Sequence, residues 1–134
     1  MTCDAMLFAD RVIQEKNGKW GLIGIFNRFT FKDFPTPPMH LWFVFIVLRE
    51  VDAGAHEFAV NLIRESVNQV VHPVNGELKV ADPAQGVTLT LPMQGVVFPK
   101  PDTYTVSVHI NGTYVTERKL YVLKANTPPE SREE

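Results

Sequence analysis

Residues 101–123 constrain the fold of this chain more than any other part of the sequence. Over residues 104–110, apolar side chains alternate with polar ones. This period of two gives a β-strand one buried face and one solvated face. Asn111 and Gly112 follow, and both residue types tolerate the positive φ angles of a type I′ turn. The sequence therefore predicts a β-hairpin whose return strand covers residues 113–122.

The apolar phase of this return strand is interrupted. With a two-residue turn, Glu117 and Lys119 would point into the core while Leu120 faced outward. One extra residue, a β-bulge, returns the apolar side chains to the core. We therefore predict a bulge near Glu117 and Arg118.

Tyr104 opens the first of these strands directly after a turn that contains Pro99 and Pro101. These residues resemble the tyrosine corner of immunoglobulin-like sandwiches, in which a Tyr at the start of a strand hydrogen-bonds back across the connection. Val106 stands where an immunoglobulin domain has its second Cys, and Cys3 is the one cysteine, so an intradomain disulfide is excluded. The resemblance implies an all-β, immunoglobulin-like antiparallel β-sandwich of the fibronectin-like, disulfide-free kind.

The whole chain also resembles small bacterial proteins that are grouped as a domain of unknown function. This second resemblance rests on the N-terminal CDAMLFADRVIQ, a middle apolar strand and the C-terminal YTVSVHINGTYVTERKLYV. It implies a fold and carries no activity, because function resides in sites rather than in folds.

Charge and hydropathy exclude two kinds of partner. Thirteen basic and fifteen acidic residues are scattered along the chain and leave a net charge of −2. Without a basic stripe to follow a phosphate backbone, we expect no nucleic-acid partner. The longest apolar run, residues 41–48, is too short for a membrane helix, so we expect no membrane association. A single Cys and a start without secretory features favour a cytoplasmic location.

The length of the chain suits one domain that needs neither metal nor disulfide for its stability. We expect a single β-sandwich domain over residues 1–125. Residues 126–134 are polar and contain two prolines, which predicts a disordered tail.

Residues 39–49 form the most apolar stretch, and as a strand this stretch has two apolar faces. A two-layer sandwich buries one face of each strand, so the other face needs a cover. The Phe-rich loop that precedes it, the N-terminal hairpin or another molecule would each supply one. A protein partner or a homo-oligomer is therefore expected as one alternative. The candidate interaction surface comprises Trp42, Val44, Ile46 and Leu48, together with Phe29, Phe31 and Phe34 of the loop.

The loop itself is predicted over residues 27–38, where three Phe side chains are followed by three prolines. Three phenylalanines in a loop need an apolar surface to lie on. Two interpretations stay open. The loop folds back over the sheet of its own domain, or it forms a tip that binds a partner.

Two further Asn-Gly pairs predict two further hairpins. The first pair, residues 17–18, joins residues 5–14 to residues 20–26 as an N-terminal hairpin. The second pair, residues 75–76, divides residues 69–80 into VVHPV and ELKV. The proline in this segment cannot donate a ladder hydrogen bond, which favours a position at a sheet edge.

The remaining segments bring the expected number of strands to about seven to nine, which is typical of a sandwich. Apart from Pro92, residues 87–93 alternate and predict a strand. Residues 53–71 fit both a helical stripe and a strand. Their β-branched content favours a strand over residues 57–64, whereas a helix there would make the fold α+β.

Side chains that could carry chemistry are scattered. The four histidines lie in separate segments without the spacing of a metal site, and the serines lie outside nucleophile motifs. The carboxylates of Glu50 and Asp52, and of Glu57 and Glu65, are interpreted as solvated charges because nothing in the sequence encloses them. We therefore expect no enzymatic activity, no metal and no cofactor.

Two classes of function remain. The first is a non-catalytic protein-interaction or structural module that self-associates or attaches to a larger bacterial assembly. The alternative is a sandwich that binds a small molecule or a carbohydrate, or an enzyme with an unrecognised site. Trp20 is the better exposed aromatic for a sugar platform because it follows a charged turn.

Overall fold

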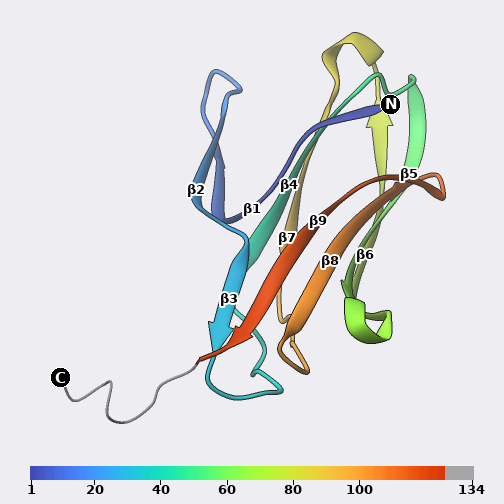
Figure 1. Ribbon diagram of the computed structural model, residues 1–134. Coiled ribbons are helices and arrows are strands. Elements are labelled where there is room, and N and C mark those ends of the chain that lie inside the picture. The colour runs from blue at the N-terminus through green and yellow to red at the C-terminus, as the bar shows by residue number, and fades with distance from the viewer. Residues whose placement is uncertain (126–134) are drawn as a thin grey trace.

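Nine β-strands in two sheets make up the computed structural model, which describes residues 1–125 (Figure 1). The four-stranded sheet, sheet A, has the strand order β2-β1-β4-β7, and the five-stranded sheet, sheet B, has the order β3-β9-β8-β5-β6. Neighbouring strands are antiparallel except for β3 and β9, which are parallel. Two single-turn 3₁₀ helices accompany the strands, and these residues contain no α-helix, which confirms the all-β class. The elements are β1 (Thr2–Gln14), β2 (Trp20–Phe26), β3 (Arg28–Phe31), β4 (Trp42–Arg49), β5 (Gly54–Arg64), η1 (Glu65–Val67), β6 (Gln69–Val80), η2 (Pro83–Gln85), β7 (Val87–Met93), β8 (Asp102–Ile110) and β9 (Thr113–Lys124).

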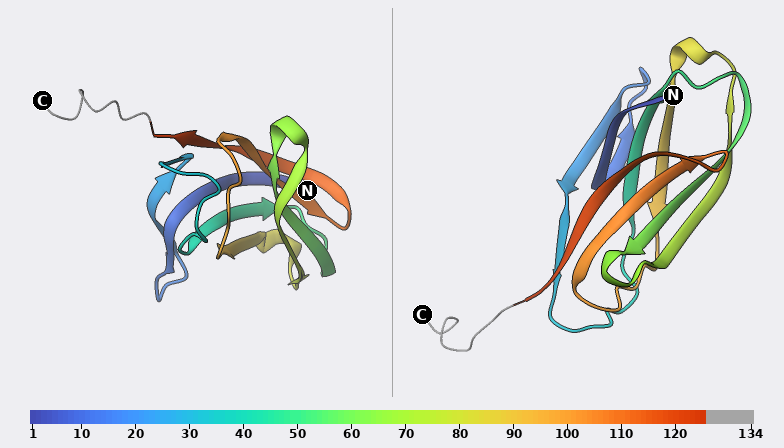
Figure 2. Two further views of the ribbon diagram at one scale, coloured as in Figure 1. Left: turned by 90° about the horizontal axis from the view of Figure 1, so that it is seen from below. Right: turned by 45° about the vertical axis from the view of Figure 1, so that its right-hand side comes forward.

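The two sheets face each other (Figure 2) and share one hydrophobic core. Phe8 and Trp42 of sheet A, Tyr104 of sheet B and Phe98 of the loop before β8 are its largest fully buried side chains. Burial of each such ring removes on the order of 150–250 Å² from water, so each of these four residues makes a large contribution to the hydrophobic stabilisation. The predicted disordered tail, residues 126–134, lies outside the described residues.

The predicted hairpin at the C-terminal end of the described chain is confirmed as β8 and β9. Asn111 and Gly112 both have positive φ angles, 51° and 79°, as a type I′ turn requires. The bulge, however, lies at Val115, because His109 pairs with Tyr114 and Val108 pairs with Thr116.

The predicted bulge position near Glu117 and Arg118 is therefore wrong by two to three residues. A bulge directly beside the turn corrects the phase before the strand enters the core. Leu120 and Val122 consequently point inward and are fully buried or nearly so, as the apolar pattern of β9 demands.

The predicted hairpin within residues 69–80 is wrong. Asn75 and Gly76 lie inside the continuous strand β6, which pairs with β5 along its whole length. Gly76 faces Phe58, and a Cβ atom at this glycine would lie 2.5 Å from the Phe58 ring. The glycine therefore makes room for an aromatic neighbour instead of forming a turn. The predicted edge position is correct, because β6 ends sheet B.

Two other segments settle the choices that the sequence left open. The stretch with both helical and strand periodicity forms strand β5, and β7 coincides with the alternating residues 87–93.

The predicted loop 27–38 contains a short strand, β3, and the prediction of an uninterrupted loop is therefore wrong. Asn27 is the single residue between β2 of sheet A and β3 of sheet B. Its carbonyl oxygen accepts a hydrogen bond of 2.9 Å from the backbone N–H of Tyr121, so β9 captures the chain as soon as it leaves sheet A.

Tyr104 ties the start of β8 to the connection that precedes it. Its ring is fully buried and packs against Phe98 at a centroid distance of 5.1 Å. Its hydroxyl donates a hydrogen bond of 2.6 Å to the backbone carbonyl of Lys100. Burial raises the pKa of this hydroxyl, so it remains a donor at neutral pH.

Replacement of Tyr104 by phenylalanine keeps the ring and removes the hydrogen bond. We expect the free energy of unfolding to fall by about 0.5–1.5 kcal/mol, with a further contribution from the unpaired carbonyl of Lys100. Urea denaturation monitored by circular dichroism measures this difference. An unchanged midpoint would show that the hydroxyl does not stabilise the connection.

A carboxylate network fixes the same end of this strand, at its first residue, Asp102. Asp102 accepts hydrogen bonds from Arg64 at 2.9 Å, from its neighbour Thr103 at 2.8 Å and from the hydroxyl of Ser66. Desolvation raises the pKa of Asp102, but these hydrogen bonds together outweigh it and hold the pKa below its usual value. The network therefore stabilises the fold in the ionised state of this carboxyl.

We expect the contribution of Asp102 to depend on pH. Because its pKa is lower in the folded state, its stabilisation is complete above the unfolded pKa of about 3.9 and is lost as the pH falls through the folded value. Asp102→Asn should therefore cost about 1–3 kcal/mol at pH 7, and this cost should shrink as the pH falls below the unfolded value. Denaturant titrations of both proteins between pH 3 and pH 7 measure this difference. A cost that is equal at both extremes would contradict the assignment.

Candidate interaction surface

The structure places the predicted interaction residues of β4 in the core. Trp42, Val44, Ile46 and Leu48 are all fully buried, because this face of β4 points toward sheet B. The candidate surface is therefore wrong for these four residues. What covers them is the second sheet of the same chain.

The three phenylalanines of the loop fold back onto this core instead of forming a tip. Phe29 contacts the Trp42 ring at a centroid distance of 5.6 Å, and Phe31 contacts Phe98 at 5.9 Å. Phe34 packs edge-on against Phe31 at 5.9 Å. The partner-binding interpretation of Phe29, Phe31 and Phe34 is not supported, since each has an intramolecular aromatic neighbour.

Backbone hydrogen bonds hold the rest of this loop against the segment before β8. Thr36 is buried, its N–H donates to the carbonyl of Phe98, and its hydroxyl accepts from the N–H of Phe98 at 3.0 Å. Met39 donates to the carbonyl of Val96 at 3.0 Å. The proline-rich loop is thus part of the domain's own packing.

The opposite face of β4 is covered by the N-terminal hairpin. Trp20 pairs with Gln14 near the hairpin turn, and Phe45 pairs with Leu7, seven residues earlier in β1. In a straight hairpin these two aromatic residues would be separated by about 23 Å at roughly 3.3 Å per residue. Their ring centroids are nevertheless 5.8 Å apart. The hairpin therefore folds back over sheet A, as Figure 1 shows where β1 reverses its course.

A glycine allows this reversal. Gly24 has a φ of +71°, and a Cβ atom there would lie 2.4 Å from the carboxylate of Asp10 on the neighbouring strand. Asp10 and Gly24 also interrupt the regular pairing of β1 with β2. The fold-back buries Phe45 almost completely and leaves Phe43 and Val47 half-buried. The hairpin is thus the cover that the two-sided strand requires.

The covering hairpin itself exposes apolar side chains. Trp20 is 38% exposed, Ile23 is 43% exposed, Ile25 is 56% exposed and Ile13 is 50% exposed. We call these four residues the hairpin surface. They lie on β2 and on the adjacent part of β1. Strand β2 is an edge strand of sheet A, and within the described chain it is hydrogen-bonded to β1 alone. Sequence reasoning missed this surface, although the alternation of Ile23 and Ile25 in a glycine-containing strand was its signal.

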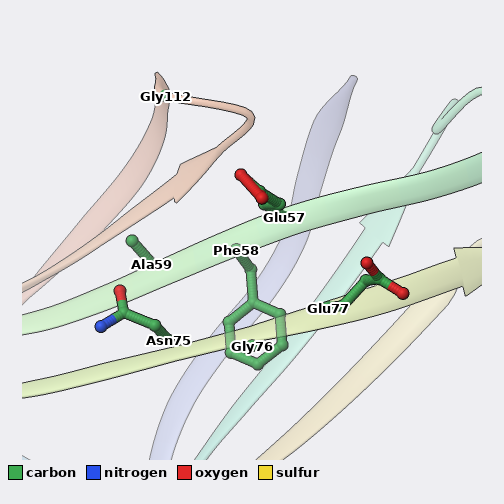
Figure 3. Close-up of a pocket in the computed structure, with 7 residues that line it drawn as sticks. All are labelled: Glu57, Phe58, Ala59, Asn75, Gly76, Glu77 and Gly112. Carbon is green, nitrogen blue, oxygen red and sulfur yellow. The ribbon is translucent and has the colours of Figure 1, made fainter.

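A cavity of about 540 Å³ lies elsewhere, against β5, β6 and the β8–β9 turn (Figure 3). Glu57 and Glu77 face each other directly across the β5–β6 pair, an arrangement of like charges that normally destabilises a sheet. The Phe58 ring lies over Gly76 beside them. The residues that line the cavity are Glu57, Phe58, Ala59, Asn75, Gly76, Glu77 and Gly112.

A hydrogen-bonded group of polar side chains lies on the outer face of sheet B. Glu65 accepts hydrogen bonds from Lys119 and from the Thr105 hydroxyl, and Lys119 also lies 3.2 Å from that hydroxyl. The hydrogen bond with Glu65 raises the pKa of Lys119, and the same bond lowers the pKa of Glu65. Lys119 is therefore an ammonium ion at neutral pH and cannot act as a base for Thr105.

The metal-binding residue types do not gather in the described chain. Residues 1–125 contain no group of three or more His, Cys, Asp or Glu side chains that could hold a metal ion. Glu57 and Glu65, paired in the sequence interpretation, are separated: Glu57 lies in the first half of β5, and Glu65 follows the end of β5, in η1. Over the same residues, no helix is long and apolar enough to cross a bilayer.

The fold and the hairpin surface define the structural class of this protein. It is a two-sheet, all-β domain with an aromatic core and a folded-back N-terminal hairpin. The chain matches the family of unknown function DUF6941 over residues 4–123, and it belongs to that family. This agrees with the expected relation to a domain of unknown function. No match is found among the curated proteins.

Proposed function

We propose that this protein is a non-catalytic protein-interaction module built on an immunoglobulin-like sandwich. Strand order supports the fold assignment: β6-β5-β8-β9 and β1-β4-β7 follow the arrangement of the two immunoglobulin sheets. The hydrogen bond from Tyr104 to the carbonyl of Lys100 gives further support, because it has the form of a tyrosine corner.

The observation that carries the proposed function is the hairpin surface on an open sheet edge. Proteins usually protect an edge strand with charges, prolines or bulges. Between Trp20 and Phe26, β2 has no charged residue and no proline, and its one irregularity is at Gly24, where the pairing with β1 is interrupted. Its exposed isoleucines therefore flank backbone groups that are available to another strand, and contiguous exposed apolar side chains of this kind mark interaction sites.

A second copy of the chain is the partner that this edge fits best. Two β2 strands can pair antiparallel about a two-fold axis, which joins two copies of sheet A into one continuous sheet. An uncharged strand meets no like-charge repulsion along residues 20–26 in such a pair. The isoleucines of both copies would then be covered together.

Light scattering coupled to size-exclusion chromatography tests this proposal. We expect the full chain to elute with the mass of two chains at micromolar concentration and to dissociate on dilution. A mass of one chain at every concentration up to 1 mM would overturn self-association through this edge. The four half-exposed isoleucines that the two copies cover should contribute about 3–6 kcal/mol, enough for association below that concentration.

A second candidate function is the binding of a small cation-bearing molecule in the cavity at Glu57 and Glu77. The two opposed carboxylates and the neighbouring Phe58 favour a ligand that carries an amine. A thermal-shift screen with spermidine, metal ions, nucleotides and sugars tests it, because a bound ligand stabilises by RT ln(1 + [L]/Kd). A shift with spermidine that is lost in Glu77→Gln would support this candidate, and no shift with any compound would exclude it.

A further inference from the structure

The turn of the N-terminal hairpin determines which backbone groups of β2 face the open edge of sheet A (Figure 1). The N–H of Glu15 donates a hydrogen bond of 2.8 Å to the carbonyl of Lys19, so these two residues form a hydrogen-bonded pair. From there the pairing of β2 with β1 is continuous as far as Ile23. Hydrogen-bonded and non-hydrogen-bonded pairs alternate along antiparallel strands. The backbone groups of Trp20 and Leu22 therefore point away from β1, toward the open edge.

The straight part of this edge ends before Gly24. Pairing between β2 and β1 is interrupted at Gly24, which has a φ of +71°. This is the point where the hairpin folds back over sheet A. An added strand would therefore run along residues 20–23, which we call the hairpin arm.

The side chains of the hairpin arm alternate between two faces. Trp20 packs against an aromatic ring of sheet A, so Trp20 and Leu22 face that sheet. Gly21 and Ile23 face outward. Ile13 of β1 pairs with Gly21, and a Cβ atom at this glycine would lie 3.0 Å from the Ile13 side chain. The outward face thus carries two half-exposed isoleucines and, at the free edge, a glycine without a side chain of its own.

We propose that a second copy of the chain binds this edge antiparallel in one register, with Leu22 facing Leu22 of the second copy about a two-fold axis. The inference rests on the self-association proposed above and specifies which residues the two copies bring together. In this register Ile23 lies opposite Gly21 of the second copy. Its side chain lies beside that glycine and contacts Ile13 of the same copy. The isoleucines of the two copies therefore cover one another.

The backbone supports the same register. Leu22 directs its N–H and C=O toward the open edge, so two copies of this residue form a hydrogen-bonded pair at the axis. Gly21 and Ile23 direct theirs toward β1, so they face each other as a non-hydrogen-bonded pair, in which the side chains lie closer together. A glycine opposite an isoleucine gives this close pair the room that it needs.

The neighbouring registers fit less well. An axis at Gly21 would put two glycines opposite each other and would place Lys19 opposite Ile23. An axis at Ile23 would require the chain beyond this residue to continue in line with the hairpin arm, but the chain bends at Gly24. The register centred on Leu22 avoids both problems.

Cysteines in the hairpin arm test the register. In a Cys3→Ser background, Leu22→Cys places two thiols on Cα atoms about 5.5 Å apart, within the range that a disulfide spans. The two cysteines of Ile23→Cys are diagonal neighbours with Cα atoms about 8 Å apart, beyond that range. With oxidised glutathione, we expect Leu22→Cys to form a disulfide-linked dimer at least about 10-fold faster than Ile23→Cys. Non-reducing gel electrophoresis measures both rates, and circular dichroism verifies that each variant is folded.

Val67→Cys in the same background reports the rate of random collision, because Val67 is 56% exposed and lies in η1, away from β2. Isotope-filtered nuclear Overhauser effects test the contact in the wild-type chain, without any substitution. Between a carbon-13-labelled copy and an unlabelled copy, we expect contacts from the methyl groups of Ile23 to those of Ile13. Contacts from Ile23 to Ile23 are expected only for an axis at that residue.

The register is overturned if a dimer forms but Ile23→Cys links as fast as Leu22→Cys, or if neither links faster than Val67→Cys. Contacts between Ile23 of one copy and Ile23 of the other would overturn it as well. Each of these results, obtained with a dimer of the wild-type mass, leaves the proposed self-association standing. A wild-type chain that stays a monomer up to about 1 mM in light scattering would overturn the register and the self-association together.

Discussion

Replacement of Trp42 by alanine is expected to lower the free energy of unfolding by about 3–5 kcal/mol, the range for large aromatic residues in cores. Trp42 is fully buried. The rings of Phe8, Phe26 and Phe29 surround it at centroid distances of 5.6–5.9 Å. The cavity that the missing indole leaves cannot close, because the residues that line it belong to both sheets. Urea denaturation followed by circular dichroism measures the loss.

Trp20→Ala is the matched control, since it removes the same side chain from the folded-back hairpin. Trp20 is partly exposed and has one aromatic neighbour, Phe45. We expect a loss of about 1 kcal/mol. Equal losses for the two variants would show that Trp42 does not occupy the core, and the placement of β4 would be wrong.

The double variant Ile23→Lys, Ile25→Lys is expected to weaken self-association by at least 100-fold. Full burial of one isoleucine contributes roughly 1.5–3 kcal/mol, so the four half-exposed isoleucines of the two copies contribute about 3–6 kcal/mol, and the opposed lysines add repulsion. The free energy of unfolding of the single chain should change by less than about 0.5 kcal/mol, because both side chains are exposed. Sedimentation equilibrium measures the dissociation constant.

Val67→Lys, Val70→Lys provides the control for charge and exposure. Val67 is 56% exposed and Val70 is 48% exposed, close to the values of the two isoleucines. They lie in η1 and β6, however, at an edge of sheet B and not at the β2 edge of sheet A. This variant should self-associate like the wild type. If it dissociated as readily as the hairpin variant, the effect would come from net charge and not from β2.

The sequence predicted strands wherever one face is apolar and the other polar. Residues 104–110 alternate strictly, residues 87–93 alternate apart from Pro92, and the two stretches lie in β8 and β7. The turn of β8 and β9 was predictable because Asn111 and Gly112 combine positive φ angles with flanking alternation. Local periodicity and turn chemistry agree in these cases, so tertiary contacts had nothing to override.

The failures have a common physical cause, which is that neighbouring strands decide what the local pattern leaves open. Asn75 and Gly76 have turn chemistry, but continuous pairing with β5 and the ring of Phe58 keep them extended. Residues 28–31 are short and followed by prolines, and only pairing with β9 makes them a strand. Such pairings join residues far apart in sequence.

The candidate site failed for the same kind of reason. Both faces of β4 are apolar, so periodicity could not tell which face points toward the second sheet. The predicted face with Trp42 proved to be the inner one. The N-terminal hairpin was among the expected covers of the outer face of β4. Its exposed isoleucines, Ile23 and Ile25, could not be predicted, because their exposure depends on how the hairpin folds back over Phe45.

Hydrogen–deuterium exchange of the full chain at low and high concentration tests the central claim most directly. If two copies meet at the open edge of β2, the amides of Trp20–Phe26 exchange more slowly at the concentration where the mass doubles, while those of β6 do not change. Association with unchanged exchange in β2, or with protection confined to β6, would contradict it.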